Sequence, residues 1–175
     1  MLAGIVVGST AFVAACGGDE KQDAGEKSAT YKLDVISASF PGRQRLAQES
    51  ELKLQVKNVG DSTIPNLSVT IDGFEQRRDD PTLANPRRPI WILNTAPFNS
   101  DSAFTDTWTV GPVPAGQTRT LRWTVTAVRA GTFSVRYKVA AGPYGKAKAE
   151  LPDGSPPKGS FLARITRAPR PVRVD

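Results

Sequence analysis

The chain has 175 residues, which is enough for one domain of ordinary size. It carries 23 basic and 17 acidic side chains, no histidine and a single cysteine. One cysteine excludes an intrachain disulfide, and the lack of histidine excludes Ser–His and Cys–His catalytic pairs and the usual Cys/His zinc sites. We therefore expect a protein that is not an enzyme, holds no cofactor and depends on its apolar core for stability.

The first element is an uncharged apolar run over residues 2–15. It is too short to span a bilayer and fits the apolar core and small-residue cleavage site of a secretory signal. Its end, Val13-Ala14-Ala15-Cys16, resembles the lipobox of bacterial lipoproteins. The resemblance implies that residues 1–15 are removed and that the Cys16 sulfur carries lipid. The alternative is a buried structural cysteine. One departure is that no basic residue precedes Lys21, whereas signals normally open with positive charge.

Residues 16–30 are rich in Gly, Asp, Glu and Lys, which predicts a flexible tether. We expect an exported protein anchored through lipidated Cys16 to the outer face of the cell membrane, or to the outer membrane where one exists. The first 30 residues carry a net charge of −2, from two lysines and four acids, so the remainder carries +8. That excess suits an envelope protein, an acidic polysaccharide or anionic lipid as partner, or solubility alone.

From Tyr31 onward, apolar and polar residues alternate in short runs separated by Gly, Pro and Asn. The apolar members of the runs are Leu52, Leu54, Val56; Leu67, Val69, Ile71; Leu121, Trp123, Val125; Phe133, Val135, Tyr137, Val139; Ala147, Ala149, Leu151; and Phe161, Ala163, Ile165. This period predicts an all-β, antiparallel, immunoglobulin-like β-sandwich of about seven to nine strands over residues 31–175. A closed barrel is the alternative, and the long irregular excursion at 75–106 favours the sandwich.

Two stretches carry a family resemblance. Leu52-Lys-Leu-Gln-Val-Lys-Asn-Val-Gly60 contains an N-x-G turn after a strand, and Val113-Pro-Ala-Gly116 supplies a Pro-x-Gly turn before a long strand. These residues resemble CARDB-type immunoglobulin-like domains of bacterial surface proteins, over roughly residues 31–151. The resemblance implies extracellular modules for adhesion, spacing or protein contact, without catalysis. The excursion and the extension over 152–175 depart from the family.

The candidate binding residues lie in or beside the excursion: Trp91, Trp108, Arg87 and Arg88. Exposed aromatics near arginines are typical of a loop that binds a glycan or a peptide. The alternative is that the two rings pin the excursion to the domain. Trp123 and Tyr137 belong to the regular alternation, so we expect them in the core, facing each other across the sandwich.

Catalytic and metal chemistry is poorly supported. The candidate carboxylates are Asp79, Asp80, Asp101 and Asp106, in or beside the excursion, and nothing in their spacing indicates a glycosidase pair or a calcium loop. No metal site is expected. The basic residues are scattered along alternating strands, so no nucleic-acid partner is expected either.

The sequence therefore predicts a monomeric, noncatalytic, lipid-anchored module for protein or envelope-polymer interaction. The alternatives are a lipoprotein that binds carbohydrate or another small ligand, and a structural spacer.

Overall fold

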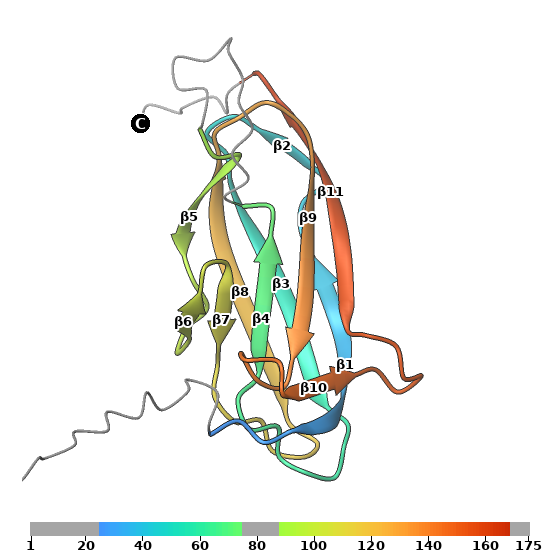
Figure 1. Ribbon diagram of the computed structural model, residues 1–175. Helices are drawn as coiled ribbons and strands as arrows, with labels where there is room; N and C mark the ends of the chain where they lie inside the picture. Colours follow the sequence, from blue (N-terminus) through green and yellow to red (C-terminus); the bar gives the residue numbers. More distant parts are fainter. Residues whose placement is uncertain (1–24, 75–87, 169–175) are drawn as a thin grey trace, which may run out of the picture.

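The computed structural model describes residues 25–74 and 88–168, which form two β-sheets stacked as a sandwich (Figure 1). The described strands are β1 (Ala29–Ser39), β2 (Arg43–Arg45), β3 (Glu49–Asn58), β4 (Ser68–Asp72), β5 (Trp91–Thr95), β6 (Asp101–Phe104), β7 (Thr107–Thr109), β8 (Thr118–Ala127), β9 (Gly131–Ala140), β10 (Ala147–Glu150) and β11 (Lys158–Thr166). The all-β sandwich predicted from the alternation is confirmed. The described strands outnumber the seven to nine expected, because several of them have only three or four residues.

One sheet has the order β10-β1-β3-β8-β5 and the other the order β2-β11-β9-β4-β7-β6. Most neighbours are antiparallel, as predicted, but β1 pairs with β10 and β11 pairs with β2 in parallel. Both sheets are therefore mixed. Alternation along one strand reports which face is buried, and it contains no information about the direction of the neighbouring strand.

The core lies between the sheets and is made by the apolar members of the predicted runs. Side chains that are fully or almost fully buried include Leu52, Leu54, Val56, Leu67, Val69, Ile71, Leu121, Trp123, Val125, Val135 and Val139. Their polar neighbours in sequence are mostly on the outer faces of the sheets, as the period of two requires. Within the described residues, no helix is long and apolar enough to cross a membrane.

The excursion is more regular than expected wherever the structure describes it. Residues 75–87, which include Arg87, Asp79 and Asp80, lie outside the described residues. From residue 88 onward the chain forms β5, which pairs with β8 at the edge of the five-stranded sheet, and then β6, which pairs with β7. Both pairings contain a register shift, so the strands are interrupted and do not show a clean alternation in the sequence.

The first and last described strands, β1 and β11, lie at the two ends of the predicted domain. The strand β1 begins at Ala29, inside the segment predicted as tether. The extension adds a strand, as expected, and β11 pairs with β9 over eight residues, from Lys158↔Lys138 to Ile165↔Gly131. The extension is thus an integral part of the six-stranded sheet.

Trp123 is buried as predicted, but its ring partner is Trp108, at a centroid distance of 5.7 Å. Tyr137 is only partly buried and lies against Phe161, at 5.7 Å. Desolvation by burial raises the pKa of Tyr137. Both residues pack in or against the core as predicted, but their ring contacts are with Trp108 on β7 and Phe161 on β11 and not with each other.

The predicted N-x-G turn is organised by a buried side chain. Asn58 is fully buried, and its amide nitrogen donates hydrogen bonds to the carbonyl oxygens of Ser62 and Val113, both at 2.8 Å. Its side-chain oxygen accepts a hydrogen bond from the Gly60 N–H at 3.0 Å. The Gly116 N–H in turn donates to the Asn58 carbonyl oxygen at 2.9 Å. One side chain therefore joins the two turns that carry the family resemblance.

Candidate functional site

The two tryptophans singled out in the excursion are buried. Trp91 is 1% exposed and Trp108 is 6% exposed. The Trp91 ring packs edge-on against Phe40 and Phe133, and its indole N–H donates a 2.8 Å hydrogen bond to the buried Gln44 side chain. Neither ring presents a face to solvent, so the arrangement matches the alternative in which the rings pin the excursion. Their burial follows from their positions on β5 and β7, which both contribute to the core.

The remaining candidates do not gather into one site. Arg88 is exposed just before β5, whereas Cys16 and Arg87 lie outside the described residues. Asp101 is exposed on β6, and Asp106 sits in the β6–β7 turn with a φ of 59°. Among residues 25–74 and 88–168, no three His, Cys, Asp or Glu side chains are grouped so that they could hold a metal ion.

The surface feature that stands out instead lies on the outer face of the six-stranded sheet, across β4, β9 and β11. A hollow of about 460 Å³ is present there, which we call the cationic hollow. It is lined by Thr70, Asp72, Arg136, Tyr137, Lys138, Lys158, Gly159 and Ser160. Its polar side chains occupy the outward positions of strands whose alternate residues are buried, so the folding of the core determines where they point.

Two lysines face each other in this hollow. Lys138 on β9 and Lys158 on β11 are directly opposite in the antiparallel register, and both are exposed. Side chains in such pairs start about 5 Å apart, and like charges at this spacing repel each other. No carboxylate within the described residues forms an ion pair with either lysine. The fold thus contains an uncompensated pair of positive charges.

The third cation of the hollow is already neutralised. Arg136 donates two hydrogen bonds to one carboxylate oxygen of Asp72, at 3.0 Å from Nε and 2.6 Å from Nη2. Asp72 lies opposite Arg136 in the β4–β9 register. This ion pair fixes one wall of the hollow, and it leaves the positive charge concentrated on the lysine pair.

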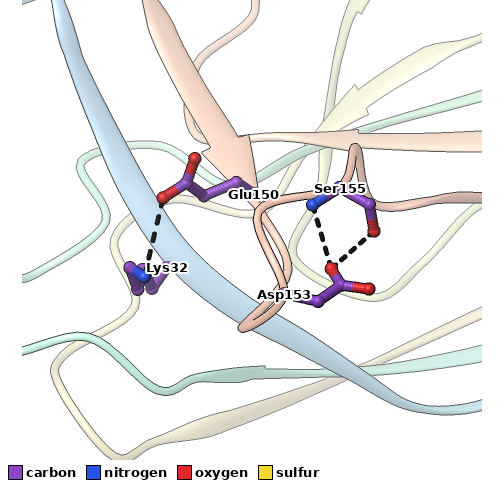
Figure 2. A network of polar contacts seen from close by, with 4 residues as sticks. All are labelled: Lys32, Glu150, Asp153 and Ser155. Carbon is purple, nitrogen blue, oxygen red and sulfur yellow. Dashed lines mark hydrogen bonds and ion pairs between the residues drawn. The ribbon is translucent and has the colours of Figure 1, made fainter.

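A second hollow of about 360 Å³ adjoins the first, and Lys138 lines both. It is bounded by β10 and by the loop that leads to β11, and Lys148 and Glu150 also line it. Figure 2 shows that Glu150 points to Lys32 on β1, with 3.8 Å between the charged atoms. The acid of this second hollow is therefore paired, whereas Lys148 has no ion pair with another described residue.

The loop beside the second hollow is held by a local polar network (Figure 2). One carboxylate oxygen of Asp153 accepts hydrogen bonds from the Ser155 hydroxyl at 2.7 Å and from the Ser155 N–H at 2.9 Å. These bonds, that of the hydroxyl first, lower the pKa of Asp153. The Leu151 N–H also donates to the Ser155 carbonyl oxygen at 2.8 Å. The hollow thus has an ordered rim.

This arrangement can hold acidic groups. Lysine ammonium groups donate to phosphate and carboxylate oxygens, and the hydroxyls of Thr70 and Ser160 supply further hydrogen-bonding atoms at the same face. The sequence contains one signal for this site, namely Lys138 at an outward position of a predicted strand; Lys158 precedes the predicted run that begins at Phe161. The signal was missed because the pairing of β9 with β11, which places the lysines opposite each other, cannot be read from either strand alone.

No protein-family model matches this chain, and no curated protein is similar to it in sequence. Solved structures with a similar fold include the CARDB domain of a Pyrococcus furiosus protein, in complex with di-metal ions. It is 16% identical, and the match covers 79% of this chain and 93% of that one, with a TM-score of 0.45. The part of Escherichia coli alpha-2-macroglobulin from domain MG7 to the C-terminus is 14% identical, with coverages of 81% and 17% and a TM-score of 0.48. A PapD-like domain of human CEP192 is 10% identical, with coverages of 79% and 85% and a TM-score of 0.41. These similarities concern the β-sandwich fold alone.

Proposed function

We propose that this protein is a noncatalytic, exported module, anchored by lipid at Cys16, that binds an acidic polymer of the bacterial envelope in the cationic hollow. The observation that carries the proposal is the opposed pair Lys138 and Lys158, which has no carboxylate partner among the described residues. Placing like charges opposite each other costs stability, and a bound anion would offset that cost. The lipobox-like Val13–Cys16 supports the anchor.

A polymer fits this surface better than a small ligand does. The cationic hollow is an open depression on a sheet face, and it continues past Lys138 into the second hollow with Lys148. A single exposed charge contact contributes only about 0.2–1 kcal/mol, so useful affinity requires several contacts along one chain. A polyanion with an acidic group on each repeat can make such contacts at both hollows.

The binding test compares two double variants that remove the same charge. Lys138→Gln with Lys158→Gln removes the two lysine charges of the cationic hollow. Lys53→Gln with Lys57→Gln removes two lysine charges from β3, in the other sheet. Binding of the full chain to polygalacturonate is measured by calorimetry, with neutral dextran as the ligand control. At about 0.7 kcal/mol for each of the two lysines, within the range for exposed charge contacts, we expect roughly tenfold weaker binding for the hollow variant. The β3 variant should bind within about threefold of wild type, because its loss acts only through screened long-range charge.

Two results would overturn the binding proposal. One is equal weakening by both variants, which would mean that net charge alone attracts the polymer. The other is wild-type affinity for polygalacturonate no greater than for dextran. The anchor is tested separately by mass spectrometry of the protein from membranes. A diacylglyceryl group on an N-terminal Cys16 supports it, and a free thiol on an uncleaved chain contradicts it while leaving the hollow untouched.

A further inference from the structure

Just before β1, the chain is held by hydrogen bonds to the loop between β9 and β10 and to the start of β10. One carboxylate oxygen of Glu26 accepts a hydrogen bond from the Tyr144 N–H at 2.9 Å, and the other accepts one from the Ala147 N–H at 3.0 Å. A Cβ at Gly142 would collide with this carboxylate, so any other residue there would displace the Glu26 side chain. Parallel pairing of β1 with β10 starts immediately afterwards, at Ala29↔Ala147. These two hydrogen bonds of Glu26, which we call the clamp, hold the start of β1 against the lower end of the sandwich in Figure 1.

This clamp limits how far the sandwich can stand from its anchor. Glu26 lies ten positions after Cys16 in the chain. A fully extended chain spans at most about 3.5 Å per residue, so the clamp lies within roughly 35 Å of a lipidated Cys16. Any surface next to the clamp is then held at a high effective concentration relative to the membrane.

An exposed aromatic pair lies next to the clamp. Phe104, at the end of the edge strand β6, and Tyr144, in the β9–β10 loop, are 44% and 43% exposed. Their rings are in edge-to-face contact, with centroids 5.6 Å apart and planes at 89°. Tyr144 is also the residue whose N–H binds Glu26. Two sequence-distant segments thus meet to present aromatic surface to solvent at the point of chain entry.

Two lysines adjoin the Glu26 hydrogen bonds, since Lys27 follows Glu26 and Lys148 follows Ala147. Lys148 lies opposite Thr30 in the β1–β10 pairing, and both lysines are exposed. Neither forms an ion pair with a described carboxylate. The charge of Glu26 is directed inward to two backbone N–H groups. We call Lys27, Phe104, Tyr144 and Lys148 the entry corner.

We infer that the entry corner binds the surface of an anionic phospholipid bilayer, with the rings of Phe104 and Tyr144 at the headgroup level and the lysines over acidic headgroups. Aromatic rings prefer the membrane–water interface, and lysines near a negatively charged leaflet are attracted to it. The corner combines aromatic rings with lysines, and it lies where the segment from Cys16 reaches the sandwich. The inference rests on the proposed lipid anchor for its geometry. It adds an orientation, in which the corner lies against the membrane.

The test measures hydrogen–deuterium exchange of the full-length protein purified from membranes. The protein is placed on vesicles of phosphatidylcholine alone, or with 30% phosphatidylglycerol. We expect slower exchange of peptides covering 101–107 and 142–148 on the anionic vesicles, and at least fivefold less slowing on the neutral ones. The variant Phe104→Ser with Tyr144→Ser should lose the slowing. The matched control, Phe98→Ser with Leu162→Ser, removes two exposed apolar side chains outside the corner and should behave as wild type.

A second variant, Lys27→Gln with Lys148→Gln, alters only exposed charge and tests the same surface if the aromatic variant unfolds. Unchanged exchange of the wild-type corner on anionic vesicles overturns the inference, and so does equal slowing on neutral ones. Slowing that needs no vesicles and grows with protein concentration also overturns it, in favour of a second copy as the partner. If Cys16 carries lipid and the corner stays unprotected, only this inference fails. If Cys16 is unmodified and the corner is still protected, only the anchor fails.

Discussion

Replacing Asn58 by alanine should lower the free energy of unfolding by about 3 kcal/mol. The side chain is fully buried and makes three hydrogen bonds, two as donor and one as acceptor. Two of its partners keep another bond, because the Val113 carbonyl still accepts from Ile64 and the Gly60 N–H still donates to Lys32. The loss is therefore three net hydrogen bonds at about 1 kcal/mol each, without a large further penalty for orphaned groups.

The assay is urea unfolding followed by tryptophan fluorescence, which the buried Trp91 and Trp123 make sensitive to the core. The control is Asn94→Ala. Asn94 also donates two side-chain hydrogen bonds, to Glu49 and Thr126, but it is exposed. Water replaces exposed bonds, so the control should cost less than about 0.5 kcal/mol. In thermal scans, the Asn58 variant should melt about 6–12 °C below wild type. A loss below about 1 kcal/mol, or equal losses for the two asparagines, would refute the idea that burial of this turn network stabilises the fold.

Three further predictions concern other sites. Gln44→Leu should lower the free energy of unfolding by about 2 kcal/mol, because it leaves the buried Trp91 N–H without its partner. In a double-mutant cycle with Trp91→Phe the two losses should be non-additive, and additive losses would contradict the hydrogen bond. Gly73→Ala should destabilise by at least about 1–2 kcal/mol, since its φ is 125° and the added Cβ would lie 2.7 Å from a backbone oxygen of β9; wild-type urea unfolding would exclude this. The carboxyl of Asp153 should titrate below its ordinary pKa in NMR, so its bonds to Ser155 are present above that ordinary value and are lost as pH falls through the lowered one. Ser155→Ala should raise this pKa part of the way back, and an unchanged titration would show that the hydroxyl has no role.

Most of the core was predictable from the sequence, and the pairing of strands was not. Leu52, Leu54 and Val56 alternate cleanly because one face of β3 is buried and the other is solvated. In β7 all three residues are buried, so no alternation marks this strand, and the sequence indicated an irregular segment at Trp108. The rule also fails at β5 and β6, where register shifts break the period.

The candidate sites were harder to predict, for a related reason. Trp91 and Trp108 were proposed from residue type, and their burial depends on which neighbours the sheets bring to them. Lys138 and Lys158 were not proposed, because each is unremarkable until the β9–β11 register places one opposite the other. Residue type and spacing within a strand are local, whereas both the burial and the charge pairing arise from contacts between distant segments.

The opposite placement of the two terminal strands has a mechanical consequence. β1 starts at the lower end of the sandwich and β11 ends at the upper end, in different sheets (Figure 1). A pull between these ends runs along the strands, so the hydrogen bonds that join β1 to β3 and β10 are loaded together in shear and do not open one after another. The load must also pass from one sheet to the other through the packed side chains. Single-molecule pulling on the two termini should therefore require more force than pulling between residue 25 and the start of β10, which peels the parallel β1–β10 pair apart from one corner.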